Sequence, residues 1–310
     1  MGTLKGRDVL SLADLSGSEV QQLLDWAIAM KKGDLNPRFQ HKIPTLGLLF
    51  HKASTRTRVS FSTAMFQLGG QVLDLNVNVM QIGRGEPIED TARVLDRYLD
   101  ALAIRTFAQA DIEVFAKYAK MPIINALTDR EHPCQVLADL QTVQENFGSC
   151  TGLTFTYVGD GNNMAHSILL GCALVGMNVR IAAPVGYQPD PAVVDQAKTI
   201  AAGKSEVVIT SDPKAAVDGA NIVYTDVWAS MGQEGESDER IPIFMPYQVN
   251  DDLMGVAAAD AIVLHCLPAH RGEEISAAVM EGPRSRIWDQ AENRMHAQKA
   301  LLAALFGLVE

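Results

Sequence analysis

Short apolar runs alternate with segments of helical spacing along the first half of the chain. Such runs, bounded by polar turns, predict buried parallel strands, and the segments between them predict the helices that connect parallel strands. A first helix is predicted after Ser16, because Glu19 stands at capping-box spacing from it. The predicted strands of this half are residues 45–50, 71–75, 101–105 and 122–126.

The same alternation begins again after a glycine-containing tract at residues 147–152, with strands predicted at 153–158, 178–183, 221–225 and 261–264. We therefore predict an α/β protein of two domains, each a mostly parallel sheet flanked by helices. The predicted domains are residues 1–147 and 148–290. Residues 291–310 are predicted to form a C-terminal helix that packs back on the first domain.

Composition excludes several classes of protein. The chain has 310 residues, and its 47% hydrophobic and 20% charged residues are ordinary for a globular protein. A net charge of −11 argues against nucleic acid as a partner. We find no run long enough for a membrane span and no apolar core of a signal peptide. The four cysteines form no Cys-x-x-Cys pair, so a reducing, cytoplasmic setting is expected.

A polar pentapeptide follows the first predicted strand and opens the next helix. Ser54, Thr55 and Thr57 bring hydroxyl groups, and Arg56 and Arg58 bring guanidinium groups. Together with the unpaired N–H groups of a helix start, these side chains favour a tetrahedral oxyanion. The alternative is that Ser54 caps the helix and the arginines are solvated. The loop lacks the Walker A pattern, so the predicted phosphate site need not bind a nucleotide.

Further polar residues lie at the ends of the last two predicted strands of this half. Arg105 ends the strand at 101–105, at the edge where open α/β sheets bind ligands, although a surface arginine is the alternative there. His132 and Gln135 follow the strand at 122–126. His132 is suited to polarise a carbonyl group and Gln135 to hold an amide, but alone the pair also fits an ordinary turn.

In the second half, the glycine-containing tract at 159–163 suggests a dinucleotide site, but Met164 stands where the third glycine belongs. Asp226 and Cys266 follow two later strands, and together they are suited to position an amine. His265 and Cys266 lack zinc-ligand spacing, so we predict no metal. The glycine-rich, acidic tract at 232–239 is predicted to be a lid.

The motifs, in order, resemble those of the aspartate/ornithine carbamoyltransferase family. They are Ser54-Thr55-Arg56-Thr57-Arg58, the lone Arg105, His132-Pro133-Cys134-Gln135, Asp226-Val227-Trp228-Ala229-Ser230-Met231-Gly232, His265-Cys266-Leu267-Pro268 and Glu292-Asn293-Arg294. The Ser-Met-Gly and His-Cys-Leu-Pro elements resemble ornithine enzymes rather than aspartate enzymes, and putrescine and acetylornithine enzymes depart at Ser-Met-Gly.

The resemblance implies transfer of the carbamoyl group of carbamoyl phosphate to the δ-amine of L-ornithine, a step of arginine biosynthesis or the urea cycle. It implies catalytic roles for Arg105, His132 and Cys266. The residues it implies for carbamoyl phosphate are Ser54, Thr55, Arg56, Thr57, Gln81, Arg105, His132, Gln135, Cys266, Leu267 and Arg294.

For ornithine, the resemblance implies contacts with Asn163, Asp226, Ser230 and Met231. It also implies a homotrimer with shared active sites, in which Gln81 reaches the site of a neighbouring subunit. No cofactor, nucleic acid or membrane is expected. Two alternatives stay open: a carbamoyltransferase for another amine, such as putrescine or acetylornithine, and a non-catalytic amino-acid sensor.

Overall fold

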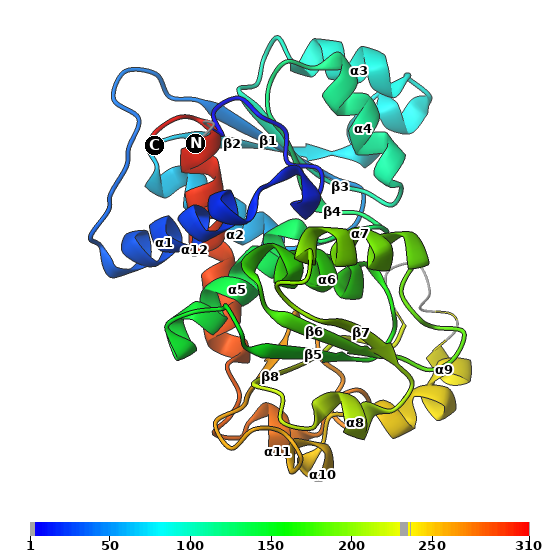
Figure 1. The fold of residues 1–310 in the computed structure, drawn as a ribbon. Coiled ribbons are helices and arrows are strands. Elements are labelled where there is room, and N and C mark those ends of the chain that lie inside the picture. The colour runs from blue at the N-terminus through cyan, green and yellow to red at the C-terminus, as the bar shows by residue number, and fades with distance from the viewer. Residues whose placement is uncertain (1–3, 230–234, 236, 310) are drawn as a thin grey trace. The chain divides into compact units, whose positions relative to one another are not determined.

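A computed structural model describes residues 4–229, 235 and 237–309 of the chain (Figure 1). By its internal contacts the chain divides into two compact units. The first unit comprises Met1–Ala138 and Asn293–Glu310, and the second comprises Asp139–Glu292. Among the described helices, none combines the length and the apolar character that crossing a membrane requires.

The first unit is built on a four-stranded sheet in which every pair of neighbouring strands is parallel. The inner strand β1 is buried along its whole length, whereas β2 at the edge is largely exposed. In spatial order the strands are β2 (Gln71–Asn76), β1 (Thr45–Phe50), β3 (Ala101–Arg105) and β4 (Ile123–Leu127). The four predicted strands of this half are thus confirmed, with small shifts at their ends.

Helices complete the first unit. Ser16 caps α1 (Gly17–Lys32) and forms the predicted capping box with Glu19. Apolar residues of β1, β3 and β4 pack with residues of α3 and α4 in one core cluster that includes Leu49, Ile104 and Phe115. The other helices that contribute to this unit are α2 (Thr55–Gln67), α3 (Ile88–Leu95), α4 (Gln109–Tyr118) and the start of α5 (Pro133–Phe147).

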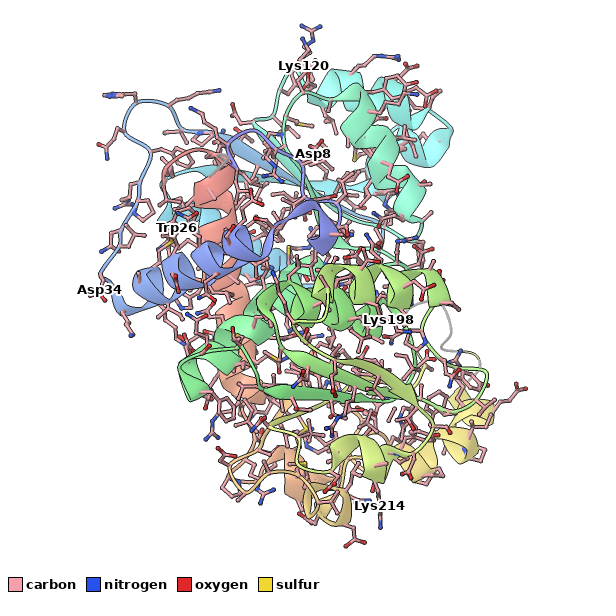
Figure 2. The ribbon with its side chains drawn as sticks, in the orientation of Figure 1. Asp8, Trp26, Asp34, Lys120, Lys198 and Lys214 are labelled. Atoms are coloured by element: carbon pink, nitrogen blue, oxygen red, sulfur yellow. The ribbon has the colours of Figure 1, made fainter. Side chains whose placement is uncertain are left out.

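Both flanking segments of the chain are tied to this unit. Near the N-terminus, Asp8, which is labelled in Figure 2, accepts a hydrogen bond from the backbone N–H of Ile123 at 2.8 Å. Val9 forms a β-bridge with Ile124. This segment therefore covers the edge of β4, which would otherwise be an open edge strand. From the other end of the chain, Lys299 of α12 (Ile287–Leu305) donates to Gln67 at 3.0 Å. The predicted return of the C-terminal helix is confirmed.

The second unit contains a five-stranded parallel sheet. Four of its strands were predicted, but the edge strand β7 was not, although Val207, Val208 and Ile209 form a short apolar run there. In spatial order the strands are β7 (Val207–Thr210), β6 (Asn178–Ala182), β5 (Thr154–Val158), β8 (Ile222–Thr225) and β9 (Ile262–His265).

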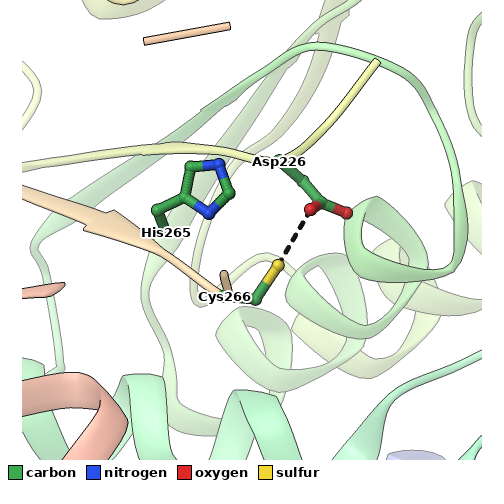
Figure 3. A group of neighbouring side chains, drawn as sticks. All are labelled: Asp226, His265 and Cys266. Carbon is green, nitrogen blue, oxygen red and sulfur yellow. Dashed lines mark hydrogen bonds between the residues drawn. The ribbon is translucent and has the colours of Figure 1, made fainter. Parts of the chain in front are cut away.

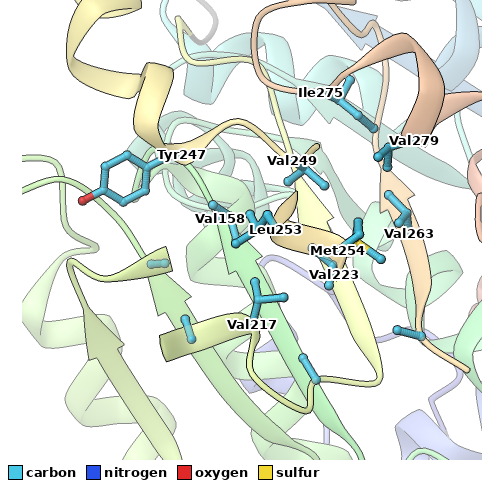
Figure 4. Packing of buried hydrophobic residues seen from close by; sticks show 14 of the residues in the cluster. Val158, Val217, Val223, Tyr247, Val249, Leu253, Met254, Val263, Ile275 and Val279 are labelled. Carbon is cyan, nitrogen blue, oxygen red and sulfur yellow. The ribbon is translucent and has the colours of Figure 1, made fainter. Parts of the chain in front are cut away.

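A buried cluster, which includes Val158, Val223 and Val263 from three neighbouring strands, forms a core of the second unit (Figure 4). Leu253 of α10 and Val279 of α11 pack against these strands. The cluster holds the strands in register and so fixes where their carboxyl ends lie. The helices of this unit are α6 (Asn163–Val175), α7 (Pro191–Ala201), α8 (Pro213–Val217), α9 (Ser237–Phe244), α10 (Asp251–Met254) and α11 (Ala277–Met280).

The chain passes between the units within α5 and within α12. The second half of α5 belongs to the second unit because Gln290 donates to Asp139 at 2.7 Å and Arg286 donates to Asn146 at 2.8 Å. The predicted domain boundary at 147/148 is the end of α5, and that at 290/291 lies within α12. These boundaries stay predictions.

Candidate active site

The first unit presents polar side chains where its strand order reverses. The next two strands along the chain, β2 and β3, lie on opposite sides of β1. Ligands of open α/β sheets bind at such switch points. Ser54 follows β1 and Arg105 ends β3. The Arg105 guanidinium donates to the Ser54 hydroxyl at 3.2 Å, so two predicted site residues meet there.

Ser54 is the N-cap residue of α2, but its side chain makes no capping hydrogen bond among the described residues. The alternative prediction of an ordinary capping serine is therefore wrong for the hydroxyl group, which accepts from Arg105 instead. Thr55 and Arg56 lie exposed in the first turn of the same helix. A helix start whose N–H groups are not used by a cap is a suitable binding site for an anion.

Arg58 departs from the predicted cluster. Its guanidinium pairs with Asp74 on β2 and lies 5.0 Å from the centre of the Phe50 ring. This arginine therefore joins α2 to the sheet. The other guanidinium of the pentapeptide, that of Arg56, lowers the pKa of His132 through its positive charge.

Arg294 of α12 joins two further predicted residues. Its guanidinium donates to the Gln135 side chain at 2.6 Å and to the Thr57 hydroxyl at 3.2 Å. Arg294 and Thr57 are almost fully buried, and buried charge needs such partners. Together with Ser54, Arg105 and His132, these three residues make up what we call the cationic cluster.

His132 lies buried among these cations. Burial lowers the pKa of its imidazole well below the usual value, and the positive charges of Arg294, Arg105 and Arg56 lower it further. The ring therefore stays neutral at physiological pH. A neutral imidazole can donate one N–H to a carbonyl oxygen while the guanidiniums carry the charge.

Gln81 is separate from the cationic cluster in the described part of the chain. It is an exposed residue before the short 3₁₀-helix η3 (Ile82–Arg84), where its carbonyl accepts from the backbone N–H of Arg84 at 2.8 Å. Its predicted reach into a neighbouring subunit stays a prediction.

The second unit also places polar residues at a switch point, between β5 and β8. Asn162 follows β5 and caps α6, and Asp226 follows β8. The Asn162 amide donates to the Asp226 carboxylate at 3.3 Å. Asn163, the predicted ornithine contact, is the first residue of α6 and is half-buried. A hydrogen-bonding role for Asn162 at the end of this strand agrees with the sequence, but its partner Asp226 is 64 residues away and has no local signal.

Cys266 meets Asp226 at this switch point. Its thiol donates to the carboxylate at 2.9 Å (Figure 3), and the backbone N–H of Val227 donates to the same oxygen at 2.8 Å. Burial raises the pKa of the Cys266 thiol well above its usual value, and the negative charge of Asp226 raises it further. The thiol is therefore a neutral hydrogen-bond donor, which argues against a thiolate nucleophile.

Leu267 has an unusual backbone conformation beside this thiol. Its φ of 60° is left-handed, which costs a non-glycine residue about 1 kcal/mol. Its N–H donates to Nδ1 of His265 at 2.8 Å, so the other ring nitrogen carries the proton and donates to Glu274 at 2.9 Å. Strain held in this way is typical of functional sites. We call Asn162, Asp226, Cys266 and Leu267 the carboxylate cluster.

Asp226, His265 and Cys266 lie close enough for their ligand atoms to be within 4.8 Å of one another. Both ring nitrogens of His265 already have partners, however, and metals bind the thiolate form of cysteine. These residues therefore fit a hydrogen-bond network better than a metal site. A second group of this kind consists of His270, Glu273 and Glu274. The absence of a metal and of a cofactor stays a prediction.

An ion pair beside the carboxylate cluster was not predicted from the sequence. Arg240 of α9 donates to Asp160 at 3.1 Å and to the carbonyl of Trp228 at 2.9 Å, and both charged side chains are buried. Burial raises the pKa of Asp160 to about 6. The two residues are far apart in the sequence, so no local pattern could have paired them.

Ser230, Met231 and half of the predicted lid tract, residues 232–234 and 236, lie outside the described residues. Gly159 and Gly161 are among the described residues. A Cβ atom at Gly161 would lie 2.3 Å from the backbone of Gln188 and of Pro189. The absence of a side chain at Gly161 therefore lets the loop at residues 187–189 pack against it. A bound dinucleotide is not needed to explain a glycine at this position.

Two family models match the chain, and together they cover most of it. Residues 7–145 match the aspartate/ornithine carbamoyltransferase, carbamoyl-P binding domain. Residues 151–305 match the aspartate/ornithine carbamoyltransferase, Asp/Orn binding domain.

Individual relatives agree with these models. The ornithine carbamoyltransferase of Nostoc punctiforme is 66% identical over 307 residues, covering 99% of each chain. That of Synechocystis is 65% identical over 306 residues, covering 99% of this chain and 98% of its own. The solved ornithine carbamoyltransferase of Pyrococcus furiosus is 48% identical with a TM-score of 0.94, covering 100% of both chains. By its motifs, its fold and these matches, the chain belongs to the aspartate/ornithine carbamoyltransferase family.

Proposed function

We propose that this protein transfers the carbamoyl group of carbamoyl phosphate to the δ-amine of L-ornithine, releasing L-citrulline and phosphate. The observation that carries the proposal is the convergence of Arg105 and Arg294 around a neutral, buried His132. Relatives named ornithine carbamoyltransferase, 63–66% identical over nearly the whole chain, support the choice of ornithine.

Carbamoyl phosphate is assigned to the cationic cluster. Its phosphate group would be held by the start of α2, through Ser54, Thr55, Arg56 and Thr57, and by Arg105. His132 would donate to the carbonyl oxygen. Gln135 and Arg294 already share a hydrogen bond of 2.6 Å, and they would hold the carbamoyl amide and the ligand's remaining oxygens.

Ornithine is assigned to the carboxylate cluster and to the residues near it. Asp226 accepts from the Asn162 amide, the Cys266 thiol and a backbone N–H, and a carboxylate has a further lone pair for an ammonium group. We propose that this ammonium is the α-ammonium of ornithine. Asn163, Ser230 and Met231 would complete the ornithine contacts, and Cys266 with Leu267 would line the reacting centre.

The chemistry requires a neutral amine and a stabilised oxyanion. A free alkyl ammonium has a pKa of about 10, so binding must favour its deprotonated form before it attacks the carbamoyl carbon. The attack places negative charge on the carbonyl oxygen, where donors from Thr57, Arg105 and His132 would stabilise it. The attacking nitrogen then gives up one proton, and collapse of the intermediate breaks the C–O bond so that phosphate leaves with that proton.

We also propose a homotrimer with shared active sites. Large apolar side chains are exposed on the first unit before the Gln81 loop: Val59 and Phe66 on α2, Leu73 on β2, and Val79. Exposed apolar side chains mark an interaction surface where they form a contiguous patch, and we propose that these four belong to one. A second copy of the chain would cover them and bring Gln81 to the neighbouring site. Sedimentation of wild-type and Phe66→Asp protein tests this, since only the wild type should sediment as a trimer. A cytoplasmic location stays a prediction.

The function is tested by a colorimetric assay of ureido products on purified protein. Carbamoyl phosphate is supplied with ornithine, putrescine, acetylornithine or aspartate in separate reactions. Product with ornithine alone is the expected result. Product with another amine would keep the assignment of carbamoyl phosphate but overturn that of ornithine. No product with any amine would favour a non-catalytic sensor.

A further inference from the structure

Glu131 is a buried acid on the loop between β4 and α5, directly before His132. Its exposed fraction is 1%, and glutamate is rarely so buried unless it has partners. This carboxyl group has no role in the predicted site or in the proposed reaction.

The partners of Glu131 come from the N-terminal segment. The carboxylate accepts from the backbone N–H of Leu12 at 3.0 Å and from the Ser11 hydroxyl. Its own backbone is held by Thr128, whose N–H donates to the Glu131 carbonyl at 2.9 Å and whose hydroxyl accepts from the Glu131 N–H at 3.2 Å. The carboxylate thus joins segments that are 119 residues apart.

The N-terminal segment gives the carboxylate a firm attachment. The carbonyl of Leu10 accepts from the Asn125 side chain at 2.8 Å, and Asn125 lies within β4. The Val9 carbonyl accepts from the Asn125 backbone N–H at 2.8 Å. Because the segment is fixed to the sheet at these points, a bond from Leu12 to Glu131 fixes the loop to the sheet as well.

We propose that Glu131 is a positioning residue: its ionised carboxylate holds the loop so that His132 and Gln135 meet carbamoyl phosphate, and protonation of the carboxyl loosens this hold. The proposal rests on the proposed function, because it assigns carbamoyl phosphate to these two residues.

The reason lies in hydrogen-bond donors and acceptors. An ionised carboxylate only accepts, and both of its partners, the Leu12 N–H and the Ser11 hydroxyl, can donate to it. A protonated carboxyl carries a hydrogen of its own, so it accepts more weakly and at fewer positions. Hydrogen bonds to a charged group are about twice as strong as neutral ones. The loop is therefore held more firmly when Glu131 is ionised.

The charge state of Glu131 changes near neutral pH. Burial raises the pKa of its carboxyl to about 7, and the negative charge of Asp14 on the N-terminal 3₁₀-helix raises it too. The positive charge of Arg130 and the bonds from Ser11 and Leu12 oppose this shift. Below neutral pH, the Glu131 carboxyl is thus protonated while exposed acids remain ionised.

The test compares Glu131→Gln, Glu131→Ala and a control, Glu113→Gln, which changes an exposed acid on α4. The affinity for carbamoyl phosphate is measured by calorimetry from pH 5.5 to 8.5, and KM and kcat with ornithine are measured beside it. Protonation of carbamoyl phosphate itself affects all proteins equally, so the affinity of each variant is compared with that of wild type at the same pH.

We expect wild type and Glu113→Gln to bind carbamoyl phosphate roughly tenfold more weakly at pH 6 than at pH 8, from the loss of a charged hydrogen bond. Glu131→Gln should bind with the weaker affinity at both pH values. Glu131→Ala should bind no better than Glu131→Gln at any pH.

A Glu131→Gln protein with the same pH profile as wild type would overturn the proposal. So would a Glu131→Ala protein that binds as tightly as wild type at pH 8, or variants that lose thermal stability without any change of the pH profile. Wild-type protein that binds carbamoyl phosphate with the expected profile but forms no citrulline would overturn the proposed function and leave the role of Glu131 standing.

Discussion

The two units use the same architecture and present opposite chemistry. Each has a parallel sheet with polar residues following the two strands at its switch point. In the first unit these residues are a hydroxyl and a guanidinium, Ser54 and Arg105. In the second unit they are an amide and a carboxylate, Asn162 and Asp226. The topology fixes where a ligand binds, and the few residues after each strand decide its charge.

The two units also differ in how they keep a titratable side chain neutral. Burial lowers the pKa of His132, and the surrounding cations act in the same direction. Burial raises the pKa of Cys266, and the neighbouring carboxylate of Asp226 acts in the same direction. In both units a charged neighbour acts in the same direction as burial, which leaves His132 and Cys266 as neutral hydrogen-bond donors.

The largest expected effect comes from the first unit. Arg105→Ala should lower kcat about 100-fold or more, because one donor to the developing oxyanion is lost. It should also raise the pKa of His132, since one of the cations that lower it is removed. Steady-state kinetics and NMR titration of the imidazole measure the two effects.

The matched control for this prediction is Arg58→Ala, which removes a guanidinium from the same helix start but one that pairs with Asp74. Its kcat should stay within about threefold of wild type, as expected for a partly exposed ion pair. Near-normal turnover by Arg105→Ala would refute the role of Arg105.

A smaller effect is expected in the second unit. Asp226→Asn should raise KM for ornithine about 30-fold or more, because the buried partner of an ammonium group is lost. The affinity for carbamoyl phosphate should stay unchanged. Asp218→Asn, which changes an exposed acid of the same unit, is the control. A loss of carbamoyl phosphate affinity in Asp226→Asn would show that the two clusters are not chemically separate.

Cys266 gives a sharper test of the second unit. Cys266→Ala removes the donor to Asp226 and should raise KM for ornithine about tenfold. Cys266→Ser keeps an O–H donor and should stay within about threefold of wild type. If the serine variant were as defective as the alanine variant, a neutral donor would not be what this position requires.

The smallest predicted effect is a loss of stability at high pH, and it should occur in both units. Burial raises the pKa of Cys134 in the first unit and of Cys150 in the second to about 12, from 9.0. Between these values, each thiol is neutral when folded and ionised when unfolded. The free energy of unfolding should therefore fall by about 1.4 kcal/mol per pH unit per thiol above pH 9.

Urea unfolding of Cys134→Ala and Cys150→Ala proteins at pH 9 and pH 10 measures this decline. Each variant should lose about 1 kcal/mol less than wild type over that step, because the unfolded thiol is already half ionised at pH 9. If either variant lost as much unfolding free energy as wild type, the thiol that it lacks would already be ionised in the folded wild-type protein.

Much of the fold could be predicted because most of its strands are buried apolar runs. Eight of the nine strands in the described part of the chain were predicted, and β7 was not, although it also contains an apolar run, Val207 to Ile209. The domain boundaries were harder to predict. The chain passes between the units within α5 and α12, and no turn signal marks a position inside a helix.

The site was predictable to the extent that its residues follow strands. Ser54, Arg105 and Asp226 gave this local signal. Arg294 was predicted from family resemblance alone, because nothing near it in the sequence points to Thr57 or Gln135. Residues that act through distant partners were missed, among them Asp160 with Arg240 and His265 with Glu274. Such pairs depend on the completed fold.

The discontinuous first unit has a consequence for how the protein is made. Arg294 leaves the ribosome after the whole of the second unit, yet it donates to Thr57 and Gln135, which were made long before. A nascent chain that lacks α12 has no complete cationic cluster, however well its first sheet has formed. On the proposed assignment of carbamoyl phosphate to this cluster, chains that stop early would be inactive and would lack the site through which this substrate could stabilise them.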